Sequence, residues 1–183
     1  MTDAQLIRRA AGGDPGAFGL LYERHWKAVY SYSWLLTQSV PDAEDITQES
    51  FLALIRRPGS FDPARAQLRT WLNAVVRRQY LGRSRRSARE SNSDDREELH
   101  VAAGLEEEMI RMERADAVRQ AMNALPQAQR EALYLFGFEG LSLSDVAGIL
   151  GIEVNAVKAR LYRGREQLKL LLAPLQTAAK ETP

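Results

Sequence analysis

Five residues near the C-terminus combine hydrogen-bonding and cationic groups at helical spacing. Asn155, Lys158, Ala159, Tyr162 and Arg163 recur at i, i+3, i+4, i+7 and i+8, so they share one face of a helix. An Asn amide can pair bidentately with adenine, and Lys and Arg neutralise phosphates. Residues 154–169 hold five basic residues and one acidic residue. This face predicts nucleic-acid binding, and the less specific alternative is a solvated basic helix face.

The elements around this face have the form of a helix-turn-helix. Ser142 and Asp145 form an S-x-x-D capping box that marks the start of a helix, and Gly151 marks its end in the left-handed region. A second helix begins near residues 153–155 and has its own apolar stripe, which includes Val157 and Leu161. The short turn, the cap and the one-sided charge together favour a DNA-binding helix-turn-helix over an ordinary αα-hairpin.

The composition argues against an enzyme. The 183 residues include no cysteine, and the two histidines, His25 and His100, lie in no metal-binding motif. The net charge of +1 means that any nucleic-acid signal is local. We see no glycine-rich phosphate loop, no Ser/His/Asp set and no implied metal or cofactor. The absence of a signal peptide and of an apolar run of about 18 residues predicts a soluble, cytoplasmic protein.

An acidic helix is predicted from about Val40 to Arg57, ended by Pro58-Gly59. Its outer side carries a set of mainly polar residues at helical spacing: Asp42, Asp45, Gln48, Glu49 and Leu52. Acidic residues in a first turn suit the helix dipole, which is the simpler explanation. The dipole does not explain why the face continues through Leu52, so a docking face for a basic partner is the alternative.

A basic helix is predicted from about Ala66 to Arg83, after a loop that begins at Ser60. Trp71 is expected to pack and hold this loop in place. A second face carries Arg69, Asn73 and Arg77, and residues 77–89 hold six arginines and no acid. The residues predicted to contact DNA here are Arg69, Asn73, Arg77, Arg78, Arg83, Arg85 and Arg86. Such a segment suits melted DNA, and the alternative is a solvated helix end.

The chain is predicted to be all-α, with two small helical domains. Residues 90–116 hold ten acidic residues and three arginines, a net of −7. We therefore expect a domain over 1–88, an acidic flexible linker over 89–115, a helix-turn-helix domain over 116–175 and a tail over 176–183.

Smaller elements are also expected in both domains. Asp3 is expected to cap a short first helix, and Asp14-Pro15 to start a second one that runs to about Thr37. His25 is interpreted as a packing residue, because no partner for it is in view. In the second domain, helices are expected over 105–124 and 127–136.

Three segments resemble bacterial sigma factors, and their order is specific. Residues 42–51 (DAEDITQESF) resemble the region that docks on the clamp helices of RNA polymerase. Residues 61–72 resemble the promoter-melting region, and 124–161 resemble the helix-turn-helix that reads the −35 element. With two such domains and a linker, the chain is similar to the extracytoplasmic-function (ECF) subgroup of the sigma-70 family.

This resemblance implies a transcription initiation factor whose partners are core RNA polymerase and promoter DNA. Many such factors are held inactive by an anti-sigma factor, which makes that kind of protein a further candidate partner. The chain departs from the subgroup at Arg78 and Gly82, where Asn and Asp are usual, and its recognition helix lacks the usual hydroxyl residues. The promoter sequence therefore cannot be inferred. The alternative function is a two-domain DNA-binding regulator that never docks on polymerase.

Overall fold

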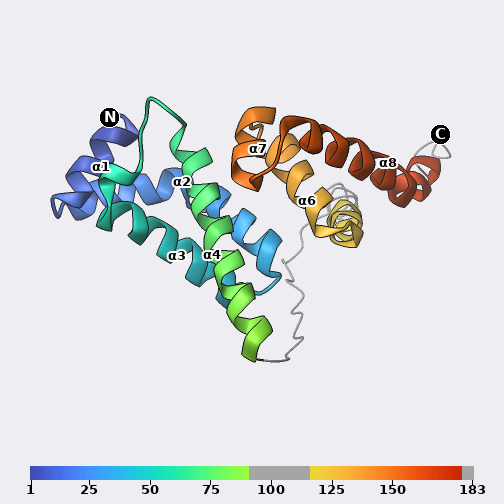
Figure 1. Ribbon diagram of the computed structural model, residues 1–183, viewed down its shortest axis with the longest axis horizontal. Coiled ribbons are helices and arrows are strands. Elements are labelled where there is room, and N and C mark those ends of the chain that lie inside the picture. The colour runs from blue at the N-terminus through green and yellow to red at the C-terminus, as the bar shows by residue number, and fades with distance from the viewer. Residues whose placement is uncertain (91–115, 179–183) are drawn as a thin grey trace. The chain divides into compact units, whose positions relative to one another are not determined.

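The computed structural model describes residues 1–90 and 116–178, with side chains for 1–85 and 116–173. In these residues the regular elements are all helical, and they gather into two compact units, which confirms the all-α prediction (Figure 1). Most of the predicted linker (89–115), the end of the predicted tail (176–183) and His100 lie outside the described residues. The helix expected over 105–124 is described only over 116–124.

The N-terminal unit consists of four α-helices and one 3₁₀ turn. They are α1 (Asp3–Ala11), α2 (Pro15–Thr37), α3 (Val40–Arg56), η1 (Pro58–Ser60) and α4 (Leu68–Glu90). As predicted, Asp14 caps α2: its Oδ1 accepts a hydrogen bond from the Ala17 N–H at 3.1 Å. The predicted α3 is also confirmed, whereas α4 runs seven residues beyond its expected end at Arg83.

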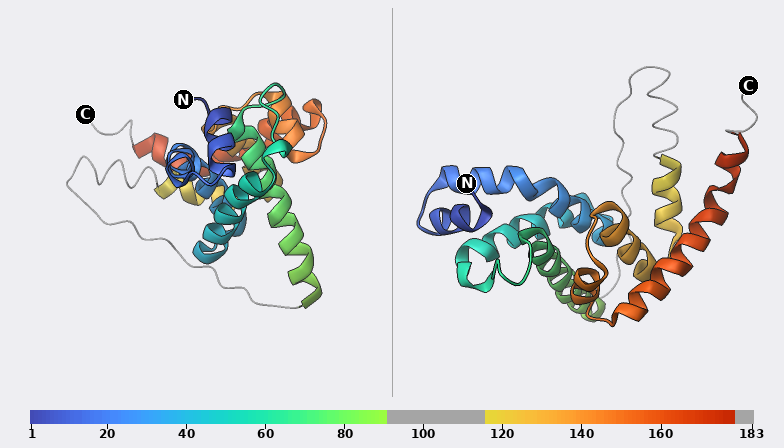
Figure 2. Two further views of the ribbon diagram at one scale, coloured as in Figure 1. Left: turned by 90° about the vertical axis from the view of Figure 1, so that its left-hand side faces the viewer. Right: turned by 90° about the horizontal axis from the view of Figure 1, so that it is seen from above.

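The core of this unit lies where α2, α3 and α4 pack together. Its largest fully buried side chains come from all four helices: Leu6, Leu21, Val29, Tyr32, Ile46, Phe51, Leu54, Leu72 and Val76. Figure 2 shows α1 folded back beside α2 in both views. Burial of these side chains fixes which face of α3 and α4 remains outside.

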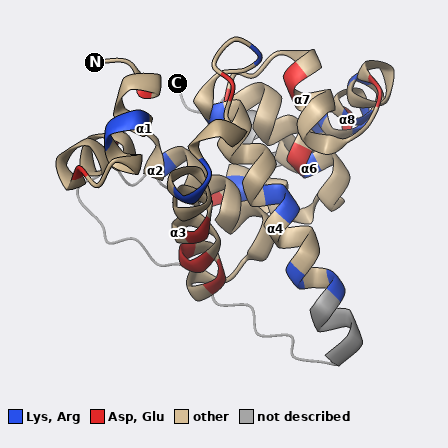
Figure 3. Ribbon diagram, turned by 60° about the vertical axis from the view of Figure 1, so that its left-hand side comes forward, with Lys and Arg blue, Asp and Glu red and all other residues tan. Residues whose placement is uncertain are grey.

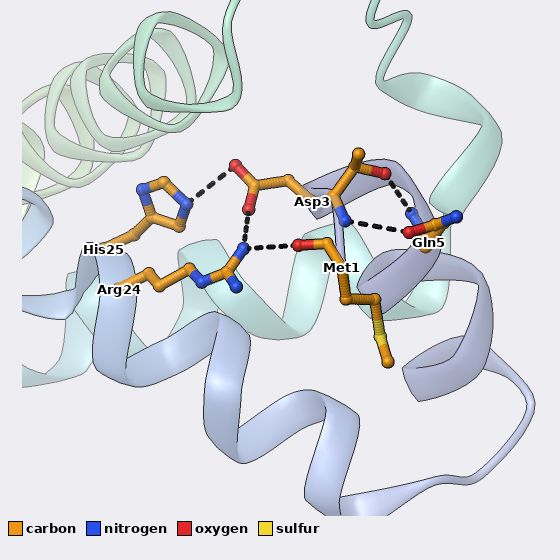
Figure 4. A network of polar contacts seen from close by, with 6 residues as sticks. Met1, Asp3, Gln5, Arg24 and His25 are labelled. Atoms are coloured by element: carbon orange, nitrogen blue, oxygen red, sulfur yellow. Dashed lines mark hydrogen bonds and ion pairs between the residues drawn. The ribbon is translucent and has the colours of Figure 1, made fainter.

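The first turn of α1 corrects two expectations (Figure 4). Thr2, rather than Asp3, is the N-cap, and it forms a capping box with Gln5. Asp3 instead contacts α2, with Oδ1 accepting from Arg24 Nη1 at 3.1 Å and Oδ2 lying 2.9 Å from His25 Nε2. His25 therefore does have a polar partner, 22 residues away along the chain.

The C-terminal unit contains a helix over 116–124 followed by four labelled elements. They are α6 (Gln127–Leu133), the π-helical turn η2 (Tyr134–Phe138), α7 (Leu143–Leu150) and α8 (Val154–Ala178). The helix expected over 127–136 thus widens at Tyr134, where the Glu139 N–H donates to the Tyr134 carbonyl at 3.0 Å. The core includes Leu135, Val146, Val157 and Leu161.

The helix-turn-helix signals act as predicted. Ser142 Oγ accepts from the Asp145 N–H at 3.1 Å at the start of α7. Gly151 has φ +63°, a conformation that residues with a Cβ rarely adopt, and it ends α7. None of the helices in the described part of the chain is both long and apolar enough to cross a membrane.

Candidate nucleic-acid and protein interfaces

The predicted DNA-reading face of α8 is exposed. Asn155, Lys158, Ala159, Tyr162 and Arg163 all lie on the surface, and Tyr162 is 67% exposed. Lys158 and Arg163 form no ion pair with any residue that the structure describes. A face with an amide, a phenol and two cations open to solvent can bind both base edges and phosphates.

Contacts on the opposite side of α8 hold this face outward. Val157 and Leu161 are buried on that side. Arg165, seven positions after Lys158, lies at a flank of the exposed face and over the Phe136 ring, 5.6 Å from its centroid. Gly164 is buried against α6, where a Cβ would lie 2.6 Å from Leu133 Cδ1. The helices approach this closely because residue 164 lacks a side chain, a requirement that the sequence analysis did not identify.

The basic residues of α4 do not form a single face. At about 100° per residue, Arg78 and Arg85 are seven positions apart and project in nearly the same direction, and both are exposed. Arg69 and Arg77 lie on another side of the helix. The Arg86 side chain lies outside the described residues. The predicted set therefore divides, and only Arg78 and Arg85 share an exposed side.

Asn73 corrects the predicted second face of α4. Its side chain is buried, with no exposed surface, and its amide forms no hydrogen bond with a described residue. In the sequence, Asn73 has the spacing of Arg69 and Arg77, and polarity alone predicted exposure. A buried amide cannot contact a phosphate, so we remove Asn73 from the DNA-contacting set.

Trp71 holds the loop that precedes α4, as predicted. Its indole Nε1–H donates to the Ser60 carbonyl at 3.0 Å, and its ring meets Phe61 edge-on with centroids 6.2 Å apart. Phe61 is buried and Trp71 is half-buried. In the loop between Phe61 and α4, residues 62–65 and Gln67 are exposed.

The acidic face of α3 is accessible, as the periodicity predicted. Asp42, Asp45, Gln48 and Glu49 are exposed, and Leu52 is half-buried. In Figure 3 the acidic residues of α3 cluster along one side of the helix, close to basic residues of α4.

Arg83 belongs to this acidic face and not to the exposed basic side of α4. Its Nη1 lies 3.6 Å from Asp45 Oδ2 and 3.8 Å from Asp42 Oδ1. Arg83 and Arg85 are close in the chain, and this proximity alone predicts that they contact the same DNA. Helical geometry turns them in different directions, so we revise the assignment of Arg83.

A groove that the sequence analysis missed lies between α2 and α3. It has a volume of about 710 Å³ and continues onto the acidic face through Gln48 and Leu52. Four aromatic residues four positions apart line it from α2: Phe18, Tyr22, Trp26 and Tyr30. Tyr22 and Trp26 stack with a 6° interplanar angle. Their spacing is a signal present in the sequence, but no site was predicted from it.

Comparison with known families matches both units. Residues 21–90 match the family described as Sigma-70 region 2, and residues 115–168 match Sigma-70, region 4. The chain is 32% identical to the ECF RNA polymerase sigma factor SigM of Mycobacterium tuberculosis strain H37Rv, over 96% of this chain and 87% of that protein. The chain belongs to the ECF subgroup of the sigma-70 family. Its function is that of a transcription initiation factor.

Similarity to other relatives supports the same family assignment for this ECF sigma factor. It is 33% identical to the ECF RNA polymerase sigma-E factor of Haemophilus influenzae, over 96% of this chain and 97% of that protein. It is also similar to the solved structure of the Bartonella quintana sigma factor RpoE in complex with the anti-sigma factor NepR. That similarity has a TM-score of 0.70 and 25% identity and covers 85% of this chain and 96% of that one.

The structure of CnrH in complex with the cytosolic domain of CnrY is similar as well. Its TM-score is 0.64, with 28% identity over 94% of this chain and 97% of that one. Each of the two family matches contains one part of the candidate interfaces. The region 2 match contains the acidic face and α4, whereas the region 4 match contains the helix-turn-helix and the exposed face of α8.

Proposed function

We propose that this sigma factor docks on core RNA polymerase through α3 and directs it to promoters through α8 and α4. The observation that carries the proposal is the exposed acidic face of α3 in a chain that also has a DNA-reading helix-turn-helix. A DNA-binding regulator that never meets polymerase has no use for such a face. The catalytic chemistry belongs to polymerase, and the sigma factor acts with it in the cytoplasm.

The docking surface combines charge with apolar area. Asp42, Asp45, Gln48 and Glu49 form its polar part, and Leu52 connects them to the aromatic groove. An apolar centre with a charged rim is the usual composition of a specific protein interface. The surface fits a basic, amphipathic segment of polymerase, with cations on the α3 carboxylates and apolar side chains in the groove.

The exposed face of α8 is assigned to the −35 duplex. Asn155 lies at the start of the helix and is the candidate for base readout, because Asn pairs bidentately with adenine. Lys158, Tyr162 and Arg163 extend the same face and supply phosphate contacts, and Ala159 allows close approach. This arrangement matches the entry of a recognition helix into the major groove by its N-terminal end.

The −10 strand is assigned to α4 and the loop before it. Arg69, Arg77, Arg78, Arg85 and Arg86 are the candidates for phosphate contacts, and the loop that follows Phe61 is the candidate for base capture. Domains over 1–88 and 116–175, an acidic linker over 89–115 and a tail over 176–183 complete the proposed organisation. An anti-sigma factor is a further proposed partner, as in the complex of the related RpoE with the anti-sigma factor NepR.

Transcription with purified core polymerase tests the proposal. The sigma factor and core enzyme should together produce transcripts from a subset of promoters in a genomic library, and neither should do so alone. DNA binding without promoter-specific transcripts would support the alternative regulator. The absence of both activities would overturn the assignment of both interfaces.

Promoter opening is tested separately. Replacing Arg77 and Arg78 with Ala should leave core binding intact but reduce the permanganate reactivity of unpaired thymines near −10. The variant Arg8→Ala is the comparison, because it removes an exposed arginine of α1 that lies outside the proposed interfaces. Normal reactivity in Arg77→Ala/Arg78→Ala would show that strand separation does not rely on these arginines.

A further inference from the structure

The acidic face of α3 already holds cations from its own chain. Arg83 Nη1 lies within 4 Å of both Asp42 and Asp45, and Arg56 Nη1 lies 3.6 Å from Glu49 Oε2. Arg56 is on α3 itself, and 66% of its side chain is exposed. Arg83 comes from another helix, and its side chain is only 38% exposed, so it is the more constrained of the two.

We propose that Arg83 competes with core polymerase for the docking carboxylates and so weakens docking until the polymerase displaces it. This inference rests on the proposed docking function of α3. In this role Arg83 adjusts the affinity of that surface, in place of the DNA contact expected from the sequence.

The geometry allows such competition. Asp45 and Asp42 have side chains that are 67% and 58% exposed, so a partner can reach both while Arg83 remains beside them. The two distances exceed ordinary hydrogen-bond length, so the attraction is mainly electrostatic and one nitrogen serves both carboxylates. A cation arriving at Asp45 therefore meets an existing positive charge and must repel it or displace it.

The expected effect of Arg83 on the affinity for core polymerase is small. Exposed ion pairs contribute little to stability, because water and salt screen them. Losing such a pair should change the dissociation constant for core polymerase by about two- to five-fold. Arg83 thus adjusts the affinity of docking without deciding whether docking occurs. It also favours partners that bring enough cations to replace it, which is a form of selectivity.

Binding of the full chain to purified core polymerase tests the proposal. The chain carries a fluorescent label, and anisotropy is measured at low and at high salt. Arg83→Met keeps a long apolar side chain but removes the charge, so it should bind core about two- to five-fold more tightly at low salt. The gain should fall as salt increases. Arg83→Lys, which keeps the charge, should bind like the wild-type chain.

Arg8→Met on α1 is the matched control, because it removes one exposed arginine that forms no ion pair within the described part of the chain. It should not tighten binding. Thermal unfolding of each variant shows whether α3–α4 packing has changed. In an Asp45→Asn background the gain from Arg83→Met should shrink, because one of the carboxylates under competition is gone.

Equal or weaker binding by Arg83→Met would overturn the inference, and so would an undiminished gain in the Asp45→Asn background. Both outcomes leave the docking function in place, since the wild-type chain still binds. A wild-type chain that does not bind core polymerase would instead overturn the proposed function itself, before any variant is compared.

Discussion

The two charged regions of the molecule differ in how their side chains are engaged. On α8, Lys158 and Arg163 lie on an exposed face and form no ion pair with a described residue. On α3 and α4, carboxylates and arginines of the same chain lie within 4 Å of each other. A face on one helix needs only its own periodicity to be recognised. Where two charged helices pack, each can partly neutralise the other, so their charges cannot be assigned one helix at a time.

The same contrast explains why the exposure of the α8 face was predicted correctly while that of the residue set on α4 was not. Every predicted residue of the α8 face is exposed, whereas Asn73 is buried and Arg83 faces α3. Experiments that change the charges of each region separately test this difference.

The largest effect is expected from charge reversal on α3. The double substitution Asp45→Lys and Glu49→Lys should abolish co-purification with core polymerase, because it places like charges at the docking interface. Both side chains are exposed, so folding should persist, as circular dichroism would show. Asp116→Lys with Glu166→Lys makes the same charge change in the other unit and should retain binding. Unchanged affinity of the α3 variant would contradict the docking assignment.

Substitutions on α8 should affect the binding of DNA and leave the binding of polymerase unchanged. Asn155→Ala should relax specificity at one −35 position by about 1–3 kcal/mol. Lys158→Ala should weaken binding to all sequences alike and lower the salt slope by about one if it contacts phosphate. Competition binding with a panel of −35 duplexes at several salt concentrations measures both quantities. An unchanged −35 preference in Asn155→Ala would remove its role in readout.

A smaller effect is expected from two glycine substitutions, one in each unit, which should change the free energy of unfolding in opposite directions. Gly164→Ala places a Cβ against Leu133, and overpacking of about 1–3 kcal/mol should exceed the gain of about 1 kcal/mol in helix propensity. At Gly82 on α4, an added Cβ would meet no atom within 4 Å, so Gly82→Ala should stabilise the fold by about 0.5–1 kcal/mol. Urea unfolding of both variants measures whether each substitution raises or lowers the free energy of unfolding. A stabilising Gly164→Ala would show that α6 and α8 can separate without cost.

The smallest expected effect concerns the cap of α2. The Ala17 N–H and the Arg9 side chain lower the pKa of Asp14. A carboxyl whose pKa is depressed on folding adds stability above its unfolded pKa, near 3.8, and loses that contribution as the pH falls through the folded value. Asp14→Asn keeps a capping oxygen but does not titrate. The stability difference between wild type and variant should therefore narrow below about pH 4, as measured by thermal unfolding. A stability difference that does not change with pH would contradict a contribution from the depressed pKa of Asp14.

Much of this fold could be predicted from local signals. The Asp14-Pro15 start, the Ser142 cap and the left-handed Gly151 each depend on a few adjacent residues, so the sequence contains what is needed. The Asp3–His25 contact and the fit of Gly164 against Leu133 depend on which helices pack together, and periodicity carries no information on that.

The candidate sites followed the same division. The α8 face and the acidic face of α3 were predictable from spacing on single helices. The aromatic groove was not, because Tyr22 and Trp26 have the spacing of core residues and only packing against α3 leaves them at its edge. The promoter sequence stays outside reach for a chemical reason, since one amide and two cations are compatible with many base sequences.

The hydrogen bond from Trp71 to Ser60 has a consequence for the proposed binding of the −10 strand to the loop before α4. It joins residues eleven positions apart, so it closes the loop before α4 within the protein itself. The chain entropy lost on closing that loop is lost during folding. A strand that binds the loop therefore meets a preorganised surface, and less of its interaction energy offsets the ordering of protein.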